Sequence, residues 1–261
     1  MVITTEAARQ LRPLPRRYRP ADLDVLTAQE ARRFINPGMP DPRADITLAW
    51  ELLYRLEPEL YDRLIQAERL HPGVLAWLPP AARRIVEVGA GTGRLTMDLI
   101  RRGQEIVAIE PAAPLRQILL RKLAAASRSP RVQVTDGFID ALPVRSDSAD
   151  LVVACSMVTP EAGHGADAGL AEMERVCRPG GRVVIVWPNH IGWLADRGYQ
   201  YVSFDGPMAM TFSSPREAAD LAAIFYPGAA AEVRRRGCAT VPYDVLGVNP
   251  PRDLAFKEKA S

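Results

Sequence analysis

Lysine and cysteine are scarce in this 261-residue sequence, and long apolar runs are absent. Basic side chains are nearly all arginine, a skew that we attribute to coding bias or stability rather than to a phosphate-binding surface. The three cysteines, Cys155, Cys177 and Cys238, are an odd number without C-x-x-C spacing. This pattern argues against a disulfide framework and against a zinc site. We therefore expect no metal and a reducing, cytoplasmic compartment.

No apolar run approaches the roughly 20 residues that a membrane span needs, and the N-terminus has no signal-peptide pattern. We expect a soluble protein that does not bind membranes. The formal net charge of +2 predicts no strong attraction to nucleic acid. An arginine-rich stretch near the N-terminus is either a nucleic-acid arm or, as we favour, a solvated strap along the domain surface.

Glycine is concentrated in one stretch, Ile85-Val86-Glu87-Val88-Gly89-Ala90-Gly91-Thr92-Gly93-Arg94-Leu95-Thr96. The stretch predicts a strand of β-branched residues, a tight turn and the start of a helix. Alternate glycines accept positive φ and let a ligand approach the backbone, so the turn indicates a bound small molecule. A dinucleotide fingerprint would need a small residue at position 94, where the chain has Arg94.

Apolar strands alternate with helices after this turn. A doubly wound, mostly parallel α/β sheet of seven strands is therefore predicted. The expected strands are 84–88, 105–109, 132–135, 150–154 and 182–187, closed by 230–243 and 252–257. The expected helices are 93–102, 113–126, 169–176, 191–198 and 215–223.

The N-terminal third predicts helices of its own. One runs from residue 21 or 23 to 35, a second begins after the N-cap Asp45, and Pro58 opens a third. We expect residues 1–78 to form a strap and helical cap or lid, and residues 79–261 to form the main domain. Trp50, Tyr54 and Tyr61 make an aromatic stripe that is either core packing or a lid over a substrate pocket.

Ligands of doubly wound sheets bind at the carboxyl ends of the strands. Glu110 ends the second strand, about twenty residues past the turn, where a carboxylate can accept hydrogen bonds from both hydroxyls of a ribose. Asp136 ends the third strand, and together with Phe138 it can contact the amino group and the ring of an adenine.

The run E-x-G-x-G-x-G resembles motif I of the class I S-adenosylmethionine-dependent methyltransferases, and Glu172–Arg182 resembles their turn before strand five. The resemblance covers residues 83–187 and is greatest to the small-molecule branch with the ubiquinone/menaquinone-type enzymes. It implies a Rossmann-like fold, S-adenosyl-L-methionine as cofactor and S-adenosyl-L-homocysteine as product. It further implies a set of cofactor-binding residues: Glu87 at the amino group, Gly89, Gly91 and Gly93 around the methionine part, Glu110 at the ribose, Asp136 at the adenine, and beside them Ala90, Pro111, Gly137, Phe138 and Cys155.

The chain departs from the family pattern after strand four, where many relatives place a histidine or aromatic residue and this chain has Cys155-Ser156-Met157-Val158-Thr159-Pro160. The [D/N/S]-P-P-[Y/F/W] motif of amino-group methylation is absent at that position. His164 and His190 are the candidate general bases, although a lone loop histidine is often structural. The expected substrate pocket contains Trp50, Tyr54, Met157 and Tyr199.

The sequence thus predicts methyl transfer to an O, N or C atom of a small molecule by in-line displacement. An RNA or protein methyltransferase that docks through the arginine-rich N-terminus is one alternative, and a non-catalytic S-adenosylmethionine-binding partner subunit is another. An NAD-linked oxidoreductase is disfavoured by Arg94. The chain is expected to be a monomer or a homodimer.

Overall fold

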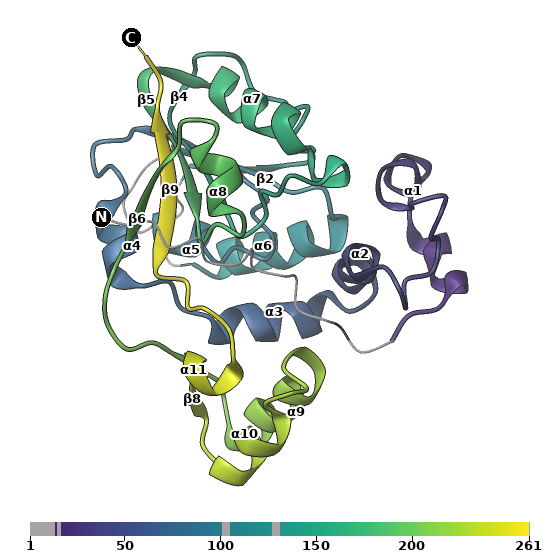
Figure 1. The fold of residues 1–261 in the computed structure, drawn as a ribbon. Coiled ribbons are helices and arrows are strands. Elements are labelled where there is room, and N and C mark those ends of the chain that lie inside the picture. The colour runs from purple at the N-terminus through teal and green to yellow at the C-terminus, as the bar shows by residue number, and fades with distance from the viewer. Residues whose placement is uncertain (1–13, 15–16, 101–104, 127–130, 261) are drawn as a thin grey trace. The chain divides into compact units, whose positions relative to one another are not determined.

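The computed structural model describes residues 14, 17–100, 105–126 and 131–260 (Figure 1). Its contacts divide the chain into two compact units. The sheet unit contains Leu70–Asp205 and the chain from Pro251 onward, and the helical unit contains the described part of Leu11–Arg69 together with Gly206–Pro250. This division differs from the expected boundary at residues 78 and 79. The reason is that 206–250 leaves the sheet and packs with the N-terminal helices.

Seven strands form the sheet of the sheet unit, as predicted. Their order is β3-β2-β1-β4-β5-β9-β6. The strand β9 runs antiparallel to both β5 and β6, and the other neighbouring strands of the sheet pair in parallel. The strands are β1 (Arg84–Val88), β2 (Glu105–Ile109), β3 (Val132–Thr135), β4 (Ala149–Cys155), β5 (Cys177–Val186), β6 (Gln200–Ser203) and β9 (Asp253–Glu258).

The register of the parallel strands aligns their carboxyl ends. Val88 pairs with Ile109 on one side and with Ala154 on the other, and Ile109 pairs with Thr135. The residues that follow these strand ends therefore share one edge of the sheet, which we call the carboxyl edge. Ligands of such sheets bind at this edge.

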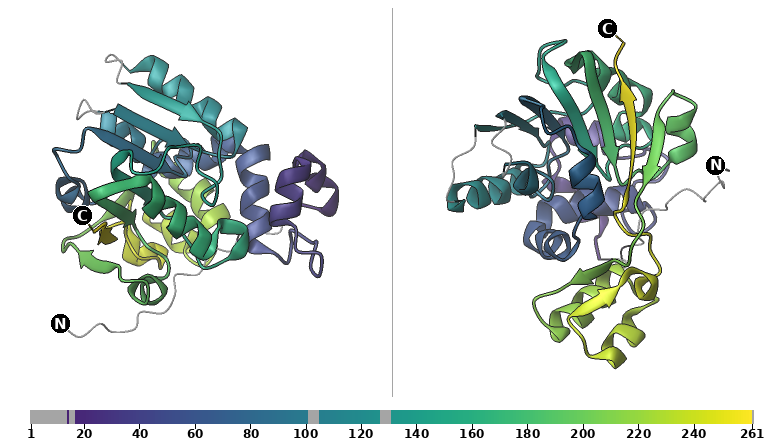
Figure 2. Two further views of the ribbon diagram at one scale, coloured as in Figure 1. Left: turned by 90° about the horizontal axis from the view of Figure 1, so that it is seen from above. Right: turned by 90° about the vertical axis from the view of Figure 1, so that its left-hand side faces the viewer.

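Helices cover both faces of the sheet, as a doubly wound fold requires (Figures 1 and 2). One apolar core joins the sheet to Met173 and Leu194, and the other joins it to Val74, Leu99 and Leu119. The first core lies under α7 (Ala166–Val176) and α8 (Ile191–Ala195), and the second under α4 (Pro72–Trp77), α5 (Thr96–Leu99) and α6 (Ala113–Ala125). The short helix η3 (Ala162–His164) precedes α7.

The helical unit is built from two separate stretches of chain. Its elements are η1 (Pro20–Val25), α1 (Ala28–Phe34), α2 (Ile46–Leu56), α3 (Pro58–Ala67), β7 (Ala209–Thr211), α9 (Pro215–Phe225), α10 (Ala230–Arg236), β8 (Thr240–Pro242) and α11 (Tyr243–Leu246). Asp45 caps α2 by accepting a hydrogen bond from the Leu48 N–H, as predicted. The two stretches meet where Trp50 stacks on Phe225 with ring centroids 5.8 Å apart.

Three of the expected elements differ in the structure. The expected strand at 230–243 is wrong: Ala230–Arg236 is the helix α10, which fits its alanine, glutamate and arginine side chains. The seventh strand is instead β6, Gln200–Ser203. The expected helix ending at residue 35 is broken at Thr27, which begins α1 with a capping box. The helix after the glycine turn is only Thr96–Leu99, and residues 101 and 102 lie outside the described part.

Within the described residues, no helix is long and apolar enough to cross a membrane. The same part of the chain holds no group of three or more His, Cys, Asp or Glu side chains that could bind a metal ion.

Candidate functional site

The glycine turn after β1 has the backbone geometry that its sequence predicts. Gly89, Gly91 and Gly93 all have positive φ, at 67°, 56° and 97°. A Cβ on Gly89 would lie 2.7 Å from Cγ of Met157, and a Cβ on Gly93 would lie 2.6 Å from Cδ1 of Leu119. Both the conformation and the space therefore require glycine. The Ala90 N–H donates to the Ile109 carbonyl at 3.0 Å and ties the turn to β2.

Glu110 reaches across from β2 to the turn. Its Oε2 accepts from the Gly91 N–H at 2.9 Å, and its Oε1 accepts from the Ala112 N–H at 2.8 Å. The side chain is buried, with 6% of the residue exposed. Each carboxylate oxygen can accept a further hydrogen bond. Two oxygens fixed in this way suit a ligand that presents two neighbouring hydroxyl groups.

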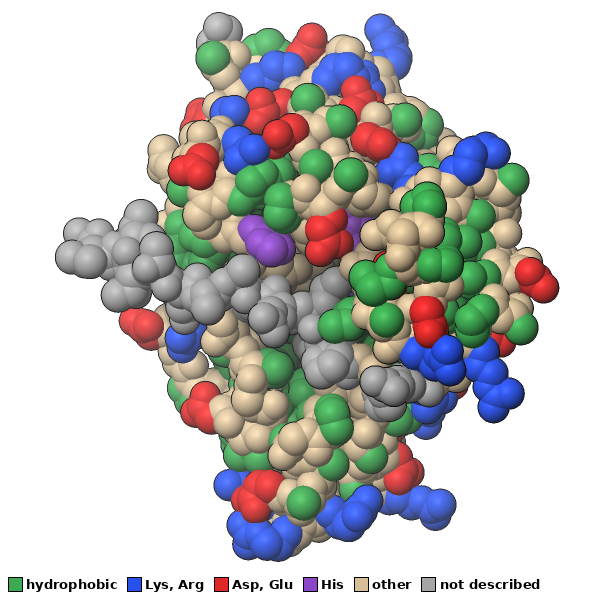
Figure 3. Space-filling model, turned by 45° about the vertical axis from the view of Figure 1, so that its right-hand side comes forward, with side chains coloured by type: hydrophobic (Ala, Val, Ile, Leu, Met, Phe, Trp, Pro, Cys, Tyr) green, Lys and Arg blue, Asp and Glu red, His purple; other side chains and the backbone are tan. Residues whose placement is uncertain are grey.

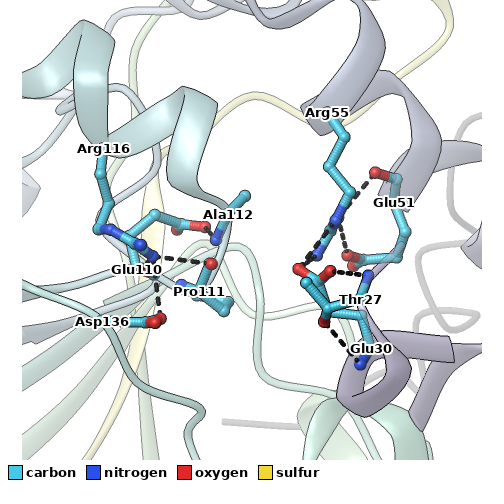
Figure 4. Close-up of polar contacts among 9 residues, drawn as sticks. All are labelled: Thr27, Glu30, Glu51, Arg55, Glu110, Pro111, Ala112, Arg116 and Asp136. Atoms are coloured by element: carbon cyan, nitrogen blue, oxygen red, sulfur yellow. Dashed lines mark hydrogen bonds and ion pairs between the residues drawn. The ribbon is translucent and has the colours of Figure 1, made fainter. Parts of the chain in front are cut away.

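Arg116 of α6 holds the ends of β2 and β3 together (Figure 4). Its Nη1 donates to the carbonyl oxygens of Glu110 and Pro111, at 2.5 and 2.7 Å, and to Oδ1 of Asp136 at 2.9 Å. The Asp136 side chain is 69% exposed and remains accessible to a ligand. A Cβ on Gly137 would lie 2.8 Å from Pro143, while Phe138 is half-buried. Nothing in the sequence pattern pointed to Arg116.

Glu87 is buried in β1 directly below the turn. Its Oε2 accepts from the Thr96 hydroxyl at 2.6 Å. Burial raises the pKa of Glu87 to about 8, although the Thr96 hydrogen bonds and the charge of Arg94 act in the opposite direction. Thr92 lies in the turn itself, where its residue is 1% exposed and its Oγ1 has no hydrogen-bond partner among the described residues. A buried hydroxyl without a partner is uncommon, and a ligand bound at the turn would supply one.

The loops after β4 and β5 meet beside the turn. The Ser156 N–H donates to the Val186 carbonyl at 2.9 Å, and the Asn189 side chain donates to the Ser156 carbonyl at 3.4 Å. Cys155 ends β4 on this edge, and Met157 packs against Gly89. The structure therefore brings Met157, predicted for the substrate pocket, next to the predicted cofactor turn.

The candidate base His164 lies beside the carboxylate of Glu161. Nδ1 of His164 lies 3.3 Å from the Thr159 hydroxyl and 3.6 Å from Oε2 of Glu161. The negative charge of Glu161 also acts on His190, which lies in the loop after β5, and by itself it would raise the pKa of His190. Burial has the larger effect and lowers the pKa of His190 overall, so this imidazole is neutral at pH 7 and can accept a proton. Figure 3 shows histidine side chains beside an acidic one on this face.

Three residues predicted for the substrate pocket lie away from the carboxyl edge or in the other unit. Tyr199 is buried, donates to Glu174 at 3.2 Å and lies under Lys257 of β9, which pairs with Val183 of β5. Trp50 and Tyr54 belong to the helical unit, where Trp50 is 7% exposed in the core.

The part of the chain that matches a known protein family contains the glycine turn and the strand ends described above. Residues 85–181 match the family model described as "Methyltransferase domain". An uncharacterized methyltransferase of Mycobacterium tuberculosis is 34% identical over 141 residues, which are 52% of this chain and 53% of that protein. A malonyl-[acyl-carrier protein] O-methyltransferase of Halorhodospira halophila is 34% identical over 131 residues, which are 49% of this chain and 40% of that protein. The chain thus spans about half the length of the curated relatives it matches.

Among solved structures, a SAM-dependent O-methyltransferase from Thermotoga maritima is 14% identical. The match has a TM-score of 0.47 and covers 77% of this chain and 71% of that one.

Proposed function

We propose that this chain, whose residues 85–181 form a class I S-adenosylmethionine-dependent methyltransferase domain, transfers a methyl group to an O, N or C atom of a small molecule. The observation that carries the proposal is the hydrogen bond from the Gly91 N–H to the Glu110 carboxylate at the carboxyl edge. This hydrogen bond supports the proposal, because the carboxylate that we predict to bind the ribose then lies beside the glycine turn.

Three features of the site suit S-adenosylmethionine. The turn has three positive-φ glycines, the Glu110 carboxylate is fixed at the turn by backbone donors, and the buried Thr92 hydroxyl has no partner within the described part of the chain. The sulfonium of the bound cofactor supplies an activated methyl group. The residues that we propose to hold the cofactor are Glu87, Gly89, Ala90, Gly91, Gly93, Glu110, Pro111, Asp136, Gly137, Phe138 and Cys155.

The acceptor is proposed to bind at the loops after β4 and β5. Met157 lies against the turn there, and the group of His164, Glu161 and His190 follows along the same loops. These residues would exclude water and align the acceptor atom with the methyl group. Where the acceptor carries a proton, His164 or His190 would accept it. Trp50 and Tyr54 of the helical unit stay predictions for the same pocket.

No observation favours the two alternative functions. Most of the arginine-rich stretch expected to dock RNA or protein lies outside the described residues, and Arg17 within them pairs with Glu57. We likewise propose a cytoplasmic protein, monomeric or homodimeric, without nucleic-acid or membrane partners.

The test is an activity assay with purified protein, S-adenosylmethionine and panels of phenols, quinones, amines and carboxylic acids. Formation of S-adenosylhomocysteine that depends on one panel supports the proposal. Turnover with RNA or protein acceptors alone would replace the small-molecule part. Binding of the cofactor without turnover on any panel would favour the partner-subunit alternative.

A further inference from the structure

A buried arginine joins α1 to α2 within the helical unit (Figure 4). The Nε and Nη2 atoms of Arg55 donate to Oε1 of Glu30, at 3.0 and 2.7 Å. Its Nη1 donates to the carbonyl oxygen and to Oε2 of Glu51, both at 2.7 Å. The Arg55 side chain is 4% exposed, and its guanidinium carbon lies 5.5 Å from the ring centroid of Phe34. Because Glu30 and Phe34 belong to α1, this one side chain of α2 holds α1 in place.

A second attachment lies two residues further along the chain, at Glu57, which is the C-cap of α2. Its Oε2 accepts from Nε of Arg17 at 3.0 Å and from the hydroxyl of Tyr18 at 2.7 Å. Residues 17–34, which we call the α1 segment, are thus fixed at both ends to the last turn of α2. In this described part of the chain, none of the six residues of η1, which lies between the two attachments, is buried.

The α1 segment and the helices beneath it are held by different interactions. Leucine side chains of α2 and α3 are buried in the helical unit: Leu48, Leu52, Leu53, Leu60 and Leu64. In α1 the buried residues are Glu30 and Phe34. Burial of apolar surface is strongly stabilising, whereas the attraction within a buried ion pair is largely offset by the loss of hydration. Segments with few buried apolar contacts open at a lower free energy than the core.

The charge of Glu30 makes the closed position of the α1 segment depend on Arg55. Burial alone would raise the pKa of Glu30, but the hydrogen bonds from Arg55 and Thr27 outweigh it and lower this pKa. Glu30 therefore stays ionised while it is buried, and a buried charge needs its partner. Loss of the guanidinium would disfavour the closed position, because water can solvate the carboxylate once the segment moves away.

We propose that the α1 segment opens away from α2 and closes again as one unit, held closed by Arg55, while α2 and α3 remain folded. Opening would expose the buried side chains of Tyr18, Leu26 and Phe34 and uncover the end of α2 that carries Arg55. The helical unit thus contains a movable cover. This inference concerns the helical unit alone and is independent of the proposed function.

Hydrogen exchange of the full chain, followed by mass spectrometry, tests the inference. In the wild type, the protection factors of residues 20–35 should be at least about 10-fold lower than those of residues 46–67. Arg55→Met keeps an apolar stem but leaves Glu30 and Glu51 without the guanidinium between them. It should lower the protection of residues 20–35 by about 10- to 100-fold, and that of residues 46–67 by less than about threefold.

Two further variants sharpen the result. Glu30→Gln lies on the α1 segment itself, so it removes the charge without altering α2. Glutamine can replace glutamate in the capping box with Thr27, and the protection of residues 20–35 should again fall selectively. Arg43→Met is the matched control, because Arg43 forms its ion pair with Asp41 on the surface of the same unit, at 2.8 Å. Its protection factors should equal those of the wild type.

An equal fall of protection in both ranges would overturn the inference, because α1, α2 and α3 would then unfold together. Unchanged protection of residues 20–35 in both Arg55→Met and Glu30→Gln would also overturn it, and so would equal protection of the two ranges in the wild type. If Arg55→Met does not fold, Glu30→Gln decides by the same criteria.

Discussion

Oε2 of Glu110 accepts a hydrogen bond from the backbone N–H of Gly91 at 2.9 Å, although the two residues are 19 positions apart. This contact joins the end of β2 to the turn that follows β1. It fixes the direction of the carboxylate, since Oε1 is held at the same time by the Ala112 N–H at 2.8 Å. A ribose would therefore meet an acceptor that is already oriented.

Glu110→Gln should weaken cofactor binding. The substitution keeps the shape of the side chain but replaces one acceptor oxygen with a donor and removes the charge. We expect the dissociation constant of S-adenosylhomocysteine, measured by calorimetry, to rise about 10- to 100-fold, because hydrogen bonds to a charged group are lost. Glu174→Gln, whose carboxylate pairs with Lys257 of β9, is the control and should leave binding unchanged. Equal affinities for Glu110→Gln and the wild type would show that Glu110 stabilises the glycine turn and does not bind the cofactor.

Thr92→Val tests whether the buried hydroxyl is a ligand contact. Valine has nearly the same shape, and the hydroxyl has no hydrogen-bond partner among the residues that the structure describes. The ligand-free protein should therefore be as stable as the wild type or slightly more stable. The affinity for S-adenosylhomocysteine should fall about 2- to 10-fold. Thermal unfolding with and without the ligand measures both effects, and Thr240→Val, an exposed site in the helical unit, is the control. An unchanged ligand-induced stabilisation in Thr92→Val would refute the contact.

Glu87 should make the stability of the ligand-free protein depend on pH. Burial raises its folded-state pKa to about 8 from an ordinary value of 4.5, so the fold favours the neutral form. The stability that this confers is complete below the ordinary pKa and is lost as the pH rises through about 8. The melting temperature of the wild type should therefore fall as the pH rises from about 4.5 to about 8, and the melting temperature of Glu87→Gln should fall less. Glu105→Gln, exposed on β2, should follow the wild type; identical curves for all three would contradict the shift.

Trp50→Ala should destabilise the helical unit. Trp50 is buried, stacks on Phe225 and meets Tyr61 edge to face at 6.4 Å. Truncation of a core aromatic costs about 3–5 kcal/mol, which denaturant unfolding followed by circular dichroism would detect. Tyr54→Ala, at a half-buried site, should cost less. If Trp50→Ala has normal stability but binds the acceptor more weakly, the aromatic stripe of Trp50, Tyr54 and Tyr61 acts as a lid and not as core packing.

The sheet was predictable because its signals are local. Runs of β-branched residues such as Ile85-Val86 between turn signals identify β1, and the strand ends then place Glu110 and Asp136. The closing strands are harder to predict, because β6 is only four residues long and the segment expected to form a strand at 230–243 begins with the helix α10.

The structural features that could not be predicted from the sequence depend on contacts between residues that lie far apart in the chain. The stacking of Trp50 on Phe225, which makes 206–250 part of the helical unit, leaves no periodic signal in either stretch. The same holds for Arg116, whose bonds to β2 and β3 arise from the packing of α6. The grouping of His190 with Glu161 likewise depends on two loops that meet only in the folded chain.

The most direct test of the account is calorimetric binding of S-adenosylmethionine, S-adenosylhomocysteine and NADH to the wild-type protein. The account predicts one site of micromolar affinity for the first two ligands and no binding of NADH. Absence of binding by both, or binding of NADH in their place, would contradict it.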